Sequence, residues 1–479
     1  MSLWKMIRLL VVAILALSAS AMAGPKVVYV PPPNGTDDTV HIQAALNTCV
    51  AQGAGCTVQL REGRYLTRQI VTYSFQGTFK GMGMDRTTIE ALPNLPVNMP
   101  DLAVDGECLP NTTSCLWPSL IIFVDGNIQV SDLSLHVTAP PGTATTGWTV
   151  FGLQISSLLD GLRFMGQHPT DVSIDGISIE GLPDDSPNSF GIVVGFPVGF
   201  NLVNGVIYTG ELPRSSTPFD YYFLSGSLTV RKSFFKGSMD GVSQDGFFRS
   251  SHVTIGGSPS AGNRFEDVLV GMDLEGSESS VYEISYNTAL GTTNGMWVEP
   301  WQPAFVPSSP SHYFIHDNAF STAGSGPGVQ AIYLYNDPSN PWIRATIWNN
   351  RLEPQAGLSD GIDAYNTKGT VIWNNTITGT GYDAIGLWGS TFSTVIGNNV
   401  SGFTPDPAVG NAQIYLDTST SNNLVVCSDP ATTVLNQGTN NVVVDCEKLL
   451  TTPGAVTNSV DPNTFTLRPG SQKGKPWGH

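Results

Sequence analysis

Acidic and aromatic residues recur together in five short segments in the second half of the chain. The segments are 271–275, 295–299, 331–335, 361–365 and 384–388. Their second and fourth residues are apolar, as in strands with one buried face, so their third and fifth residues face solvent. The acidic and aromatic residues at those outward positions are Asp273, Glu275, Trp297, Glu299, Tyr333, Tyr335, Asp363, Tyr365 and Trp388.

Such a pattern suits a surface that binds sugars. Aromatic rings stack on the apolar faces of sugars, and carboxylates accept hydrogen bonds from sugar hydroxyls. The predicted substrate-binding residues are Trp297, Tyr333, Tyr335, Tyr365, Trp388 and Asp273. The structural alternative is a ladder of rings that stabilises a parallel sheet without any ligand, by roughly 0.2–1 kcal/mol a pair.

Paired carboxylates also suit glycosidic bond cleavage. Strands in a sheet lie about 4.8 Å apart, close to the roughly 5 Å between the two acids of a retaining glycosidase. Glu275 and Glu299 are neighbours in this scheme, as are Asp360 and Asp383, which precede successive strands. The predicted catalytic residues are Asp360, Asp383, Asp363, Glu299 and Glu275.

Two other readings of these residues stay open. Close carboxylates bind calcium through oxygen ligands, so calcium is a possible cofactor, although no metal is required and no metal ligand is identified. Lyase chemistry needs a base beside a neutralised carboxylate, for which Tyr333, Tyr335 and Tyr365 are candidates.

An internal repeat indicates the elements that must position these residues. Segments ending in asparagine recur about 24 to 32 residues apart, each followed by one of the strands above. The repeated asparagines are Asn287, Asn318, Asn350, Asn375 and Asn399. Short strands separated by Gly and Asn favour a solenoid of parallel β-helix repeats, in which the asparagines hydrogen-bond one another at a turn.

The first part of the chain indicates a cap for that solenoid. Residues 37–46 carry apolar side chains at helical spacing after Asp37-Asp38-Thr39. A V-x-L-x-x-G-x-Y segment at 58–65 and a G-x-G turn at 81–83 follow. This order resembles the amino-terminal cap and first coils of the pectin-lyase-like superfamily. The resemblance implies an all-β, single-stranded right-handed parallel β-helix with an N-terminal capping α-helix and polysaccharide-directed activity.

A second, partial resemblance concerns the acids. Residues 359–363 and 381–385 are similar to the N-T-D-G and G-D-D-C motifs of polygalacturonases, which implies that Asp360 and Asp383 match two of that family's three active-site aspartates. Tyr382 stands where the third would be, and the family's downstream G-H-G and R-I-K motifs have no counterpart.

The domain organisation follows from the two ends. Residues 1–23 read as a signal peptide, with Lys5 and Arg8 before an apolar run that ends in Ala21-Met22-Ala23. Residues 24–56 form the lead and capping helix, 57–447 the β-helix and 448–479 a C-terminal tail. Loop insertions are predicted near 93–118, 182–220 and 300–311. We expect the protein to be secreted or periplasmic, without a membrane span.

The cysteines indicate the cellular compartment, and the net charge limits which classes of partner are expected. The six cysteines predict local disulfides, Cys49–Cys56, Cys108–Cys115 and Cys427–Cys446, in an oxidising compartment. A net charge of −17 argues against nucleic acid as a partner. The expected partner is a polysaccharide, which the protein binds along its outer strand face and cleaves as a glycoside hydrolase or polysaccharide lyase. The alternative is a non-catalytic envelope, adhesive or glycan-binding β-helix. No oligomer interface is readable.

Overall fold

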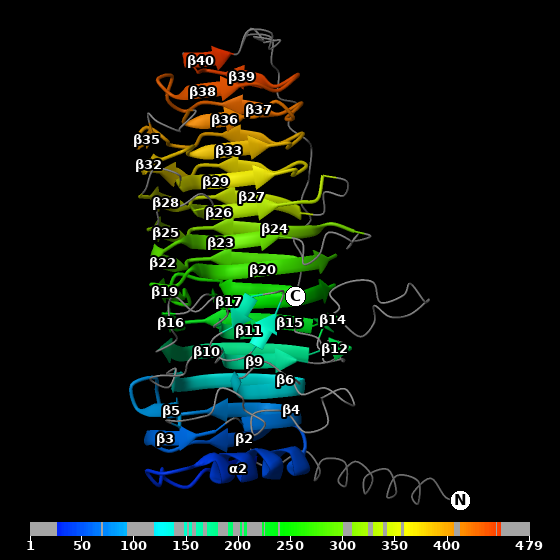
Figure 1. Ribbon diagram of the computed structural model, residues 1–479, viewed down its shortest axis with the longest axis vertical. Helices are drawn as coiled ribbons and strands as arrows, with labels where there is room; N and C mark the ends of the chain where they lie inside the picture. Colours follow the sequence, from blue (N-terminus) through cyan, green and yellow to red (C-terminus); the bar gives the residue numbers. More distant parts are fainter. Residues whose placement is uncertain are drawn as a thin grey trace, which may run out of the picture.

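The chain winds into a tall stack of parallel coils, with a helix at one end and strand β40 at the other (Figure 1). The structure is a computed structural model that describes residues 26–68, 70–92, 119–137, 148–150, 153–155, 160–165, 170–180, 190–194, 202–203, 206–207, 223–224, 226–237, 240–299, 309–323, 329–338, 343–355, 359–406, 412–446 and 448–451. The fold is the predicted right-handed parallel β-helix. Among the residues described, no helix has the length and apolar character needed to cross a bilayer.

The cap is helix α2 (Thr39–Gln52), which lies across the first coil. Its apolar face buries Ile42, Ala45, Leu46 and Cys49 against the first strands, closing a core that the first coil would otherwise expose to water. The disulfide Cys49–Cys56 ties the helix to the strand that follows it.

Three columns of parallel strands make up the coils. The first column pairs β1 (Lys26–Tyr29), β2 (Cys56–Gln59), β4 (Ile70–Lys80), β6 (Ser119–His136), β10 (Thr170–Glu180), β15 (Gly226–Arg231), β18 (His252–Gly256), β21 (Val281–Ser285), β24 (Ser311–His316), β27 (Ile343–Trp348), β30 (Val371–Trp373), β34 (Thr394–Ile396), β37 (Leu424–Val426) and β39 (Val442–Val444).

The second column begins with β3 (Gly63–Thr67) and β5 (Thr87–Ala91) and includes the ends of β6 and β10. It continues through β16 (Phe234–Lys236), β19 (Arg264–Glu266), β22 (Thr288–Thr292), β25 (Ala319–Thr322), β28 (Arg351–Pro354) and β31 (Thr376–Ile377). Beside it, β32 (Gly379–Gly381) pairs with β35 (Phe403–Pro405).

The third column starts with the first residues of β4 and β6. It continues through β9 (Asp160–Met165), β11 (Phe190–Val194), β17 (Asp240–Arg249), β20 (Val270–Glu278), β23 (Asn294–Glu299), β26 (Val329–Tyr335), β29 (Ser359–Tyr365), β33 (Ile385–Trp388), β36 (Ile414–Leu416), β38 (Thr433–Asn436) and β40 (Lys448–Thr451). Strand β14 (Phe223–Leu224) pairs with β17, while β7 (Trp148–Val150) with β8 (Leu153–Ile155) and β12 (Leu202–Val203) with β13 (Val206–Ile207) form antiparallel pairs.

A ladder of buried asparagine side chains joins the coils at the turn between the first and second columns. Each amide nitrogen donates to the amide oxygen one coil further on, at 2.9–3.0 Å. The ladder runs through Asn263, Asn287, Asn318, Asn350, Asn375 and Asn398. At the later turns the residue just before the ladder asparagine has a left-handed backbone, as at Asp317 and Asn349.

The last member of this ladder differs from the prediction. Asn398, not Asn399, accepts from Asn375 and donates to the carbonyl of Ile372. Gly397 supplies the left-handed residue, so the turn begins one position earlier, and Asn399 is exposed.

Some of the predicted segment boundaries fall on residues that the structure describes and can be compared with it. Strand β11, inside the insertion expected at 182–220, pairs with β9 and β17 and so is part of a coil. Strand β40 pairs with β38, so the chain from 448 continues the stack through Thr451. Cys427–Cys446 forms the second disulfide among the described residues. The signal peptide, the loop at 93–118 with Cys108–Cys115, most of the loop at 300–311 and residues 452–479 lie outside the described residues.

Replacing Asn398 by alanine should lower the free energy of unfolding by about 1–3 kcal/mol, because buried partners on two coils lose their hydrogen bonds. Asn399→Ala is the matched control, since its side chain is exposed and bonds only to Ser401 within the same turn. Urea denaturation of both variants measures the difference. An equal or larger loss for Asn399→Ala would place that residue in the ladder instead.

Candidate functional site

The strand register stacks the predicted outward residues of the third column one above another. The expectation that all of them face solvent is wrong for Asp273 and Asp363, which are 7% and 1% exposed. Asp273 pairs with Trp297, Trp297 with Tyr333, Tyr333 with Asp363, Asp363 with Gly386 and Gly386 with Tyr415. In the second outward row, Glu275 pairs with Glu299, and Tyr335 with Tyr365, which in turn pairs with Trp388. We call these outward residues of the third column the ribbon.

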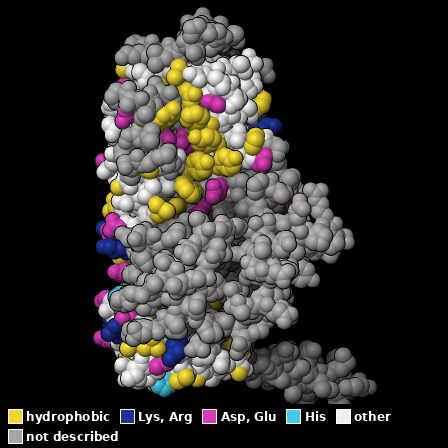
Figure 2. All heavy atoms as spheres, viewed as in Figure 1, with side chains coloured by type: hydrophobic (Ala, Val, Ile, Leu, Met, Phe, Trp, Pro, Cys, Tyr) yellow, Lys and Arg dark blue, Asp and Glu magenta, His cyan; other side chains and the backbone are white. Residues whose placement is uncertain are grey.

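The rings of the ribbon contact one another over successive coils. The ring centroids of Trp297 and Tyr333 are 6.0 Å apart, and those of Tyr333 and Tyr365 are 5.5 Å apart. Tyr365 stacks on Trp388 at 5.4 Å with an interplanar angle of 4°. The last ring of the series is that of Tyr415, whose centroid lies 4.7 Å from that of Trp388. Figure 2 shows hydrophobic side chains gathered in a band along the upper half of the stack, with acidic side chains among them.

Three carboxyl groups meet beside these rings, at the start of strands β29 and β33. They are Asp360, Asp363 and Asp383, and they are 6%, 1% and 0% exposed. The backbone N–H of Asp383 donates to Asp360 at 2.8 Å. The indole N–H of Trp388 donates to Asp363 at 3.1 Å, and the side chains of Asp360 and Asp363 are hydrogen-bonded to each other.

Burial raises the pKa of both carboxyls in the Asp360–Asp363 pair. The pKa of Asp360 rises far above its usual range, because desolvation is reinforced by the negative charge of Asp363. The pKa of Asp363 rises less, because Asp360, Trp388 and Gln330 hydrogen-bond its carboxylate. The two environments thus raise the two pKa values to different extents, with that of Asp360 raised the more.

Asp360 and Asp383 also belong to a column of hydrogen-bond acceptors. Its side-chain acceptors are Asn294, Asp360 and Asp383, and Gln330 and Ala412 occupy the equivalent positions on their own coils. Asn294 accepts the backbone N–H of Gln330 at 2.6 Å, Asp360 that of Asp383, and Asp383 that of Ala412 at 3.3 Å. The amide of Asn294 makes the same kind of contact, so the contact itself does not require a carboxyl group.

Gly386 leaves the space in which Trp388 reaches Asp363. A Cβ atom at this position would lie 2.3 Å from Oδ1 of Asp363 and 2.6 Å from Nε1 of Trp388. Any side chain there would break the hydrogen bond between the ribbon and the acid cluster.

The other predicted acids lie on lower coils. Glu299 is half-buried near Tyr333, and burial raises its pKa. Asp273 is buried one coil below Trp297. The backbone of Glu275 pairs with that of Glu299, but its side chain lies outside the described part of the chain. Glu275 and Glu299 are thus separated from the Asp360 cluster by the coil that carries Tyr333.

Gln330 is the site residue that the sequence reasoning missed. It pairs with Asp360 in register and hydrogen-bonds Asp363. The sequence does contain a signal for it: Gln330 lies two residues before the inward Ile332, just as Asp360 lies two residues before the inward Ile362 one coil later.

The sequence left calcium open as a cofactor, and the described residues were compared with the arrangement that a metal ion needs. Within them, no group of three or more His, Cys, Asp or Glu side chains is arranged to hold a metal ion.

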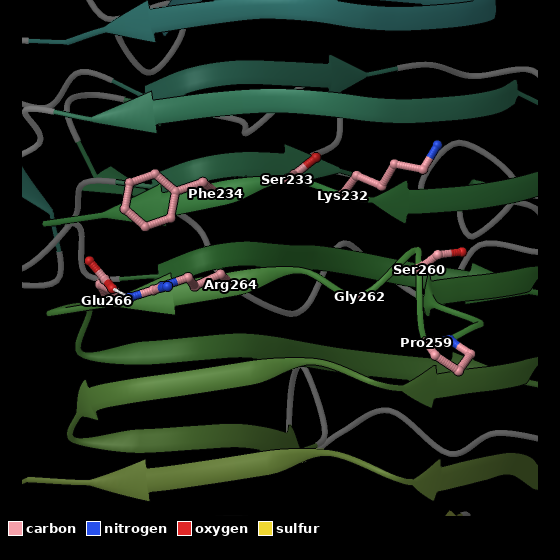
Figure 3. A pocket seen from close by; sticks show the side chains of 8 residues that line it. All are labelled: Lys232, Ser233, Phe234, Pro259, Ser260, Gly262, Arg264 and Glu266. Atoms are coloured by element: carbon pink, nitrogen blue, oxygen red, sulfur yellow. Dashed lines mark hydrogen bonds and ion pairs between the residues drawn. The ribbon is translucent and has the colours of Figure 1, made fainter. Parts of the chain in front are cut away.

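A separate recess of about 470 Å³ lies on another face of the stack, along β16 and β19. Figure 3 shows Arg264 turned toward Glu266, to which it is ion-paired. Lys232 on its rim pairs with Asp175 at 3.1 Å. Of its lining residues only Phe234 is aromatic, so the recess offers far less ring surface than the ribbon.

The capped stack of coils with a ribbon of outward rings and acids defines the class of this protein. It is a right-handed parallel β-helix. No protein-family model matches the chain, and no curated protein matches its sequence.

Solved structures with a similar course of the chain include the Dettilon tailspike protein, with a TM-score of 0.47 and 13% identity over 89% of this chain and 68% of that one. DFA-IIIase from Arthrobacter chlorophenolicus A6 gives a TM-score of 0.46 and 10% identity over 85% of this chain and 96% of that one. The A-module of the mannuronan C-5 epimerase AlgE6 from Azotobacter vinelandii gives 0.38 and 13% over 89% and 96%. The chemistry of this protein has to be argued from its own residues.

The raised carboxyl pKa values predict a pH-dependent stability. The folded state holds these protons more tightly than the unfolded chain, so their contribution is fully present below the ordinary aspartate pKa of 3.8. It is lost as the pH rises through the raised values. Asp360→Asn should therefore reduce the fall in the free energy of unfolding between pH 4 and pH 8. At pH 8 the variant should be more stable than the wild type by about 1 kcal/mol or more.

Chemical denaturation of wild type and variant between pH 4 and pH 8 measures this effect. Asp445→Asn, an exposed aspartate near the last coil, is the control and should keep the wild-type profile. Parallel profiles for wild type and Asp360→Asn would mean that Asp360 is ionised like any surface acid.

Proposed function

We propose that this protein is a secreted or periplasmic carbohydrate-active enzyme that binds an extended polysaccharide along the ribbon and hydrolyses it at the acid cluster. The observation that carries the proposal is the burial of Asp360, Asp363 and Asp383 together beside a continuous series of rings, in surroundings that raise the pKa of Asp360 more than that of Asp363. A glycosidase needs one protonated and one ionised carboxyl at the scissile bond, and two environments that separate their pKa values provide that.

Binding along the ribbon is supported by the accompanying acids. Stacked rings alone would stabilise the sheet by roughly 0.2–1 kcal/mol a pair and explain the aromatic residues without a ligand. Such a ladder gives no reason for Glu299, Asp360, Asp363 and Asp383 beside it. A buried carboxyl costs a fold more than a buried amide, and Asn294 shows that an amide serves the same acceptor column.

In the proposed reaction, Asp360 donates its proton to the glycosidic oxygen as the bond from that oxygen to the anomeric carbon breaks. Asp383 supplies the second carboxylate, which attacks the anomeric carbon, and water then releases the sugar with Asp360 acting as base. The two acids occupy equivalent positions on neighbouring coils, about 4.8 Å apart, which fits the roughly 5–5.5 Å of retaining enzymes. Asp363 holds the proton of Asp360 in place.

Hydrolysis is favoured over β-elimination by the state of the tyrosines. Burial, together with nearby carboxylates, raises the pKa of both Tyr333 and Tyr365 well above the usual value for a phenol. Both therefore stay protonated at neutral pH and lack the basic form that proton abstraction requires.

The competing candidate is a non-catalytic glycan-binding β-helix. The burial of the three aspartates favours it, since a substrate reaches them only after a local rearrangement. The two candidates differ in turnover and agree in binding.

Asp360→Asn and Asp383→Asn should each lower hydrolysis by about 10²-fold or more, as expected when a general acid or its partner carboxylate is lost, while both variants still bind glycan. The assay measures new reducing ends and the ultraviolet absorbance of unsaturated products over a polysaccharide panel. Asp445→Asn is the control with wild-type activity. Reducing ends without absorbance support hydrolysis, absorbance supports elimination, and retention on a glycan without turnover supports the binding protein.

A further inference from the structure

The C-terminal half of the chain is almost free of basic residues. Between Arg264 and Lys448 the sequence contains only three, Arg344, Arg351 and Lys368. Acidic residues continue at their usual frequency through the same stretch. This asymmetry covers all coils that build the ribbon.

None of the three basic residues belongs to the third column. Arg344 is an exposed residue of β27 in the first column, and Arg351 an exposed residue of β28 in the second. Lys368 lies in a turn, with its ammonium 5.9 Å from the centre of the Phe392 ring. The third-column strands from β20 to β38 contain no lysine or arginine at all.

We infer that the ribbon accepts an uncharged glycan and rejects polymers that carry carboxylate, sulfate or phosphate groups. The inference rests on the proposed function and names the substrate class of that same site. It is carried by the column of acids with no basic residue on any of its strands.

The spacing of the coils makes the acidic field cumulative. Successive coils are about 4.8 Å apart, less than the Debye length of about 8 Å at physiological ionic strength. Glu299, the Asp360 cluster and Asp417, which follows β36, therefore act together on a bound chain. A charged substituent on the glycan would meet the carboxylates of several coils, and the third-column strands from β20 to β38 offer no lysine or arginine to pair with it.

The polar groups of the ribbon suit hydroxyl-bearing sugars instead. Carboxylates accept hydrogen bonds from sugar hydroxyls, and phenols and indoles donate to sugar oxygens. The indole Nε1 of Trp297 has no hydrogen-bond partner within the described part of the molecule. This nitrogen is buried, so a ligand would reach it only after a local rearrangement.

Several basic residues outside the ribbon are paired with acids. In the N-terminal half, Arg64 pairs with Glu90 and Arg86 with Glu62. At the recess in Figure 3, Lys232 and Arg264 are already paired with acids. At these four positions the positive charge is neutralised by a neighbouring carboxylate.

Matched polymers test the inference. Affinity electrophoresis compares each neutral polysaccharide of a panel with its own carboxymethylated derivative, with EDTA present, at low and at physiological salt. For a neutral polymer that binds, we expect at least 10-fold weaker retention of the charged derivative at low salt and a smaller difference at higher salt. Glu299→Gln should narrow the difference, and the remote Asp445→Asn should leave it unchanged.

Each other outcome overturns a defined claim. Preferential binding of a uronate polymer or of the carboxymethylated forms in EDTA would reject the neutral-glycan inference and leave the proposed function standing. The same preference seen only with added calcium would also reject it and make the ion the partner of the substrate charge. Absence of binding and turnover with every polymer would reject the proposed function and the inference together.

Discussion

A parallel coil that slips by one residue against its neighbour turns every outward side chain of that strand into the core. In this molecule the asparagine ladder prevents such a slip, because each buried amide fits only its counterpart one coil away. The ribbon exists because this register is kept: Trp297, Tyr333 and Asp363 are separated by 36 and 30 residues of sequence and still occupy one line. Binding and catalysis as proposed here both require it.

The fold could be predicted because its sequence signals lie within single strands and single turns. Alternating apolar residues mark the strands, and the repeated asparagines mark the turns, so the columns of Asp273 and of Tyr335 could be predicted from sequence. The capping helix has its own local signal in the apolar spacing of Ile42, Ala45 and Leu46. The prediction was wrong for one turn, because Gly397 adopts the left-handed backbone one residue earlier than the pattern of the other turns indicates.

The acid cluster was harder to predict. Residues three apart on a straight strand lie on opposite faces, so alternation separates Asp360 from Asp363. Their side chains are nevertheless hydrogen-bonded, at the start of a strand where all residues from Ser359 to Ala364 are buried. Sequence patterns gave the residue types and missed Gln330, because a contact at the end of a strand depends on how three coils pack. The retention of buried aspartates where an amide would serve is typical of sites that give up stability for chemistry.

The amide ladder also sets a limit on the chemical lifetime of the molecule. Deamidation of Asn350 would replace its donating nitrogen by an oxygen that faces Oδ1 of Asn375 and the carbonyl of Ile315, both acceptors. Two attractive contacts would become repulsive, and the new negative charge would be buried among acceptors. A single ageing event in the middle of the stack would thus weaken the contact between two neighbouring coils that the three columns of strands still hold together. Tight burial of these side chains protects the protein from the reaction that its architecture tolerates least.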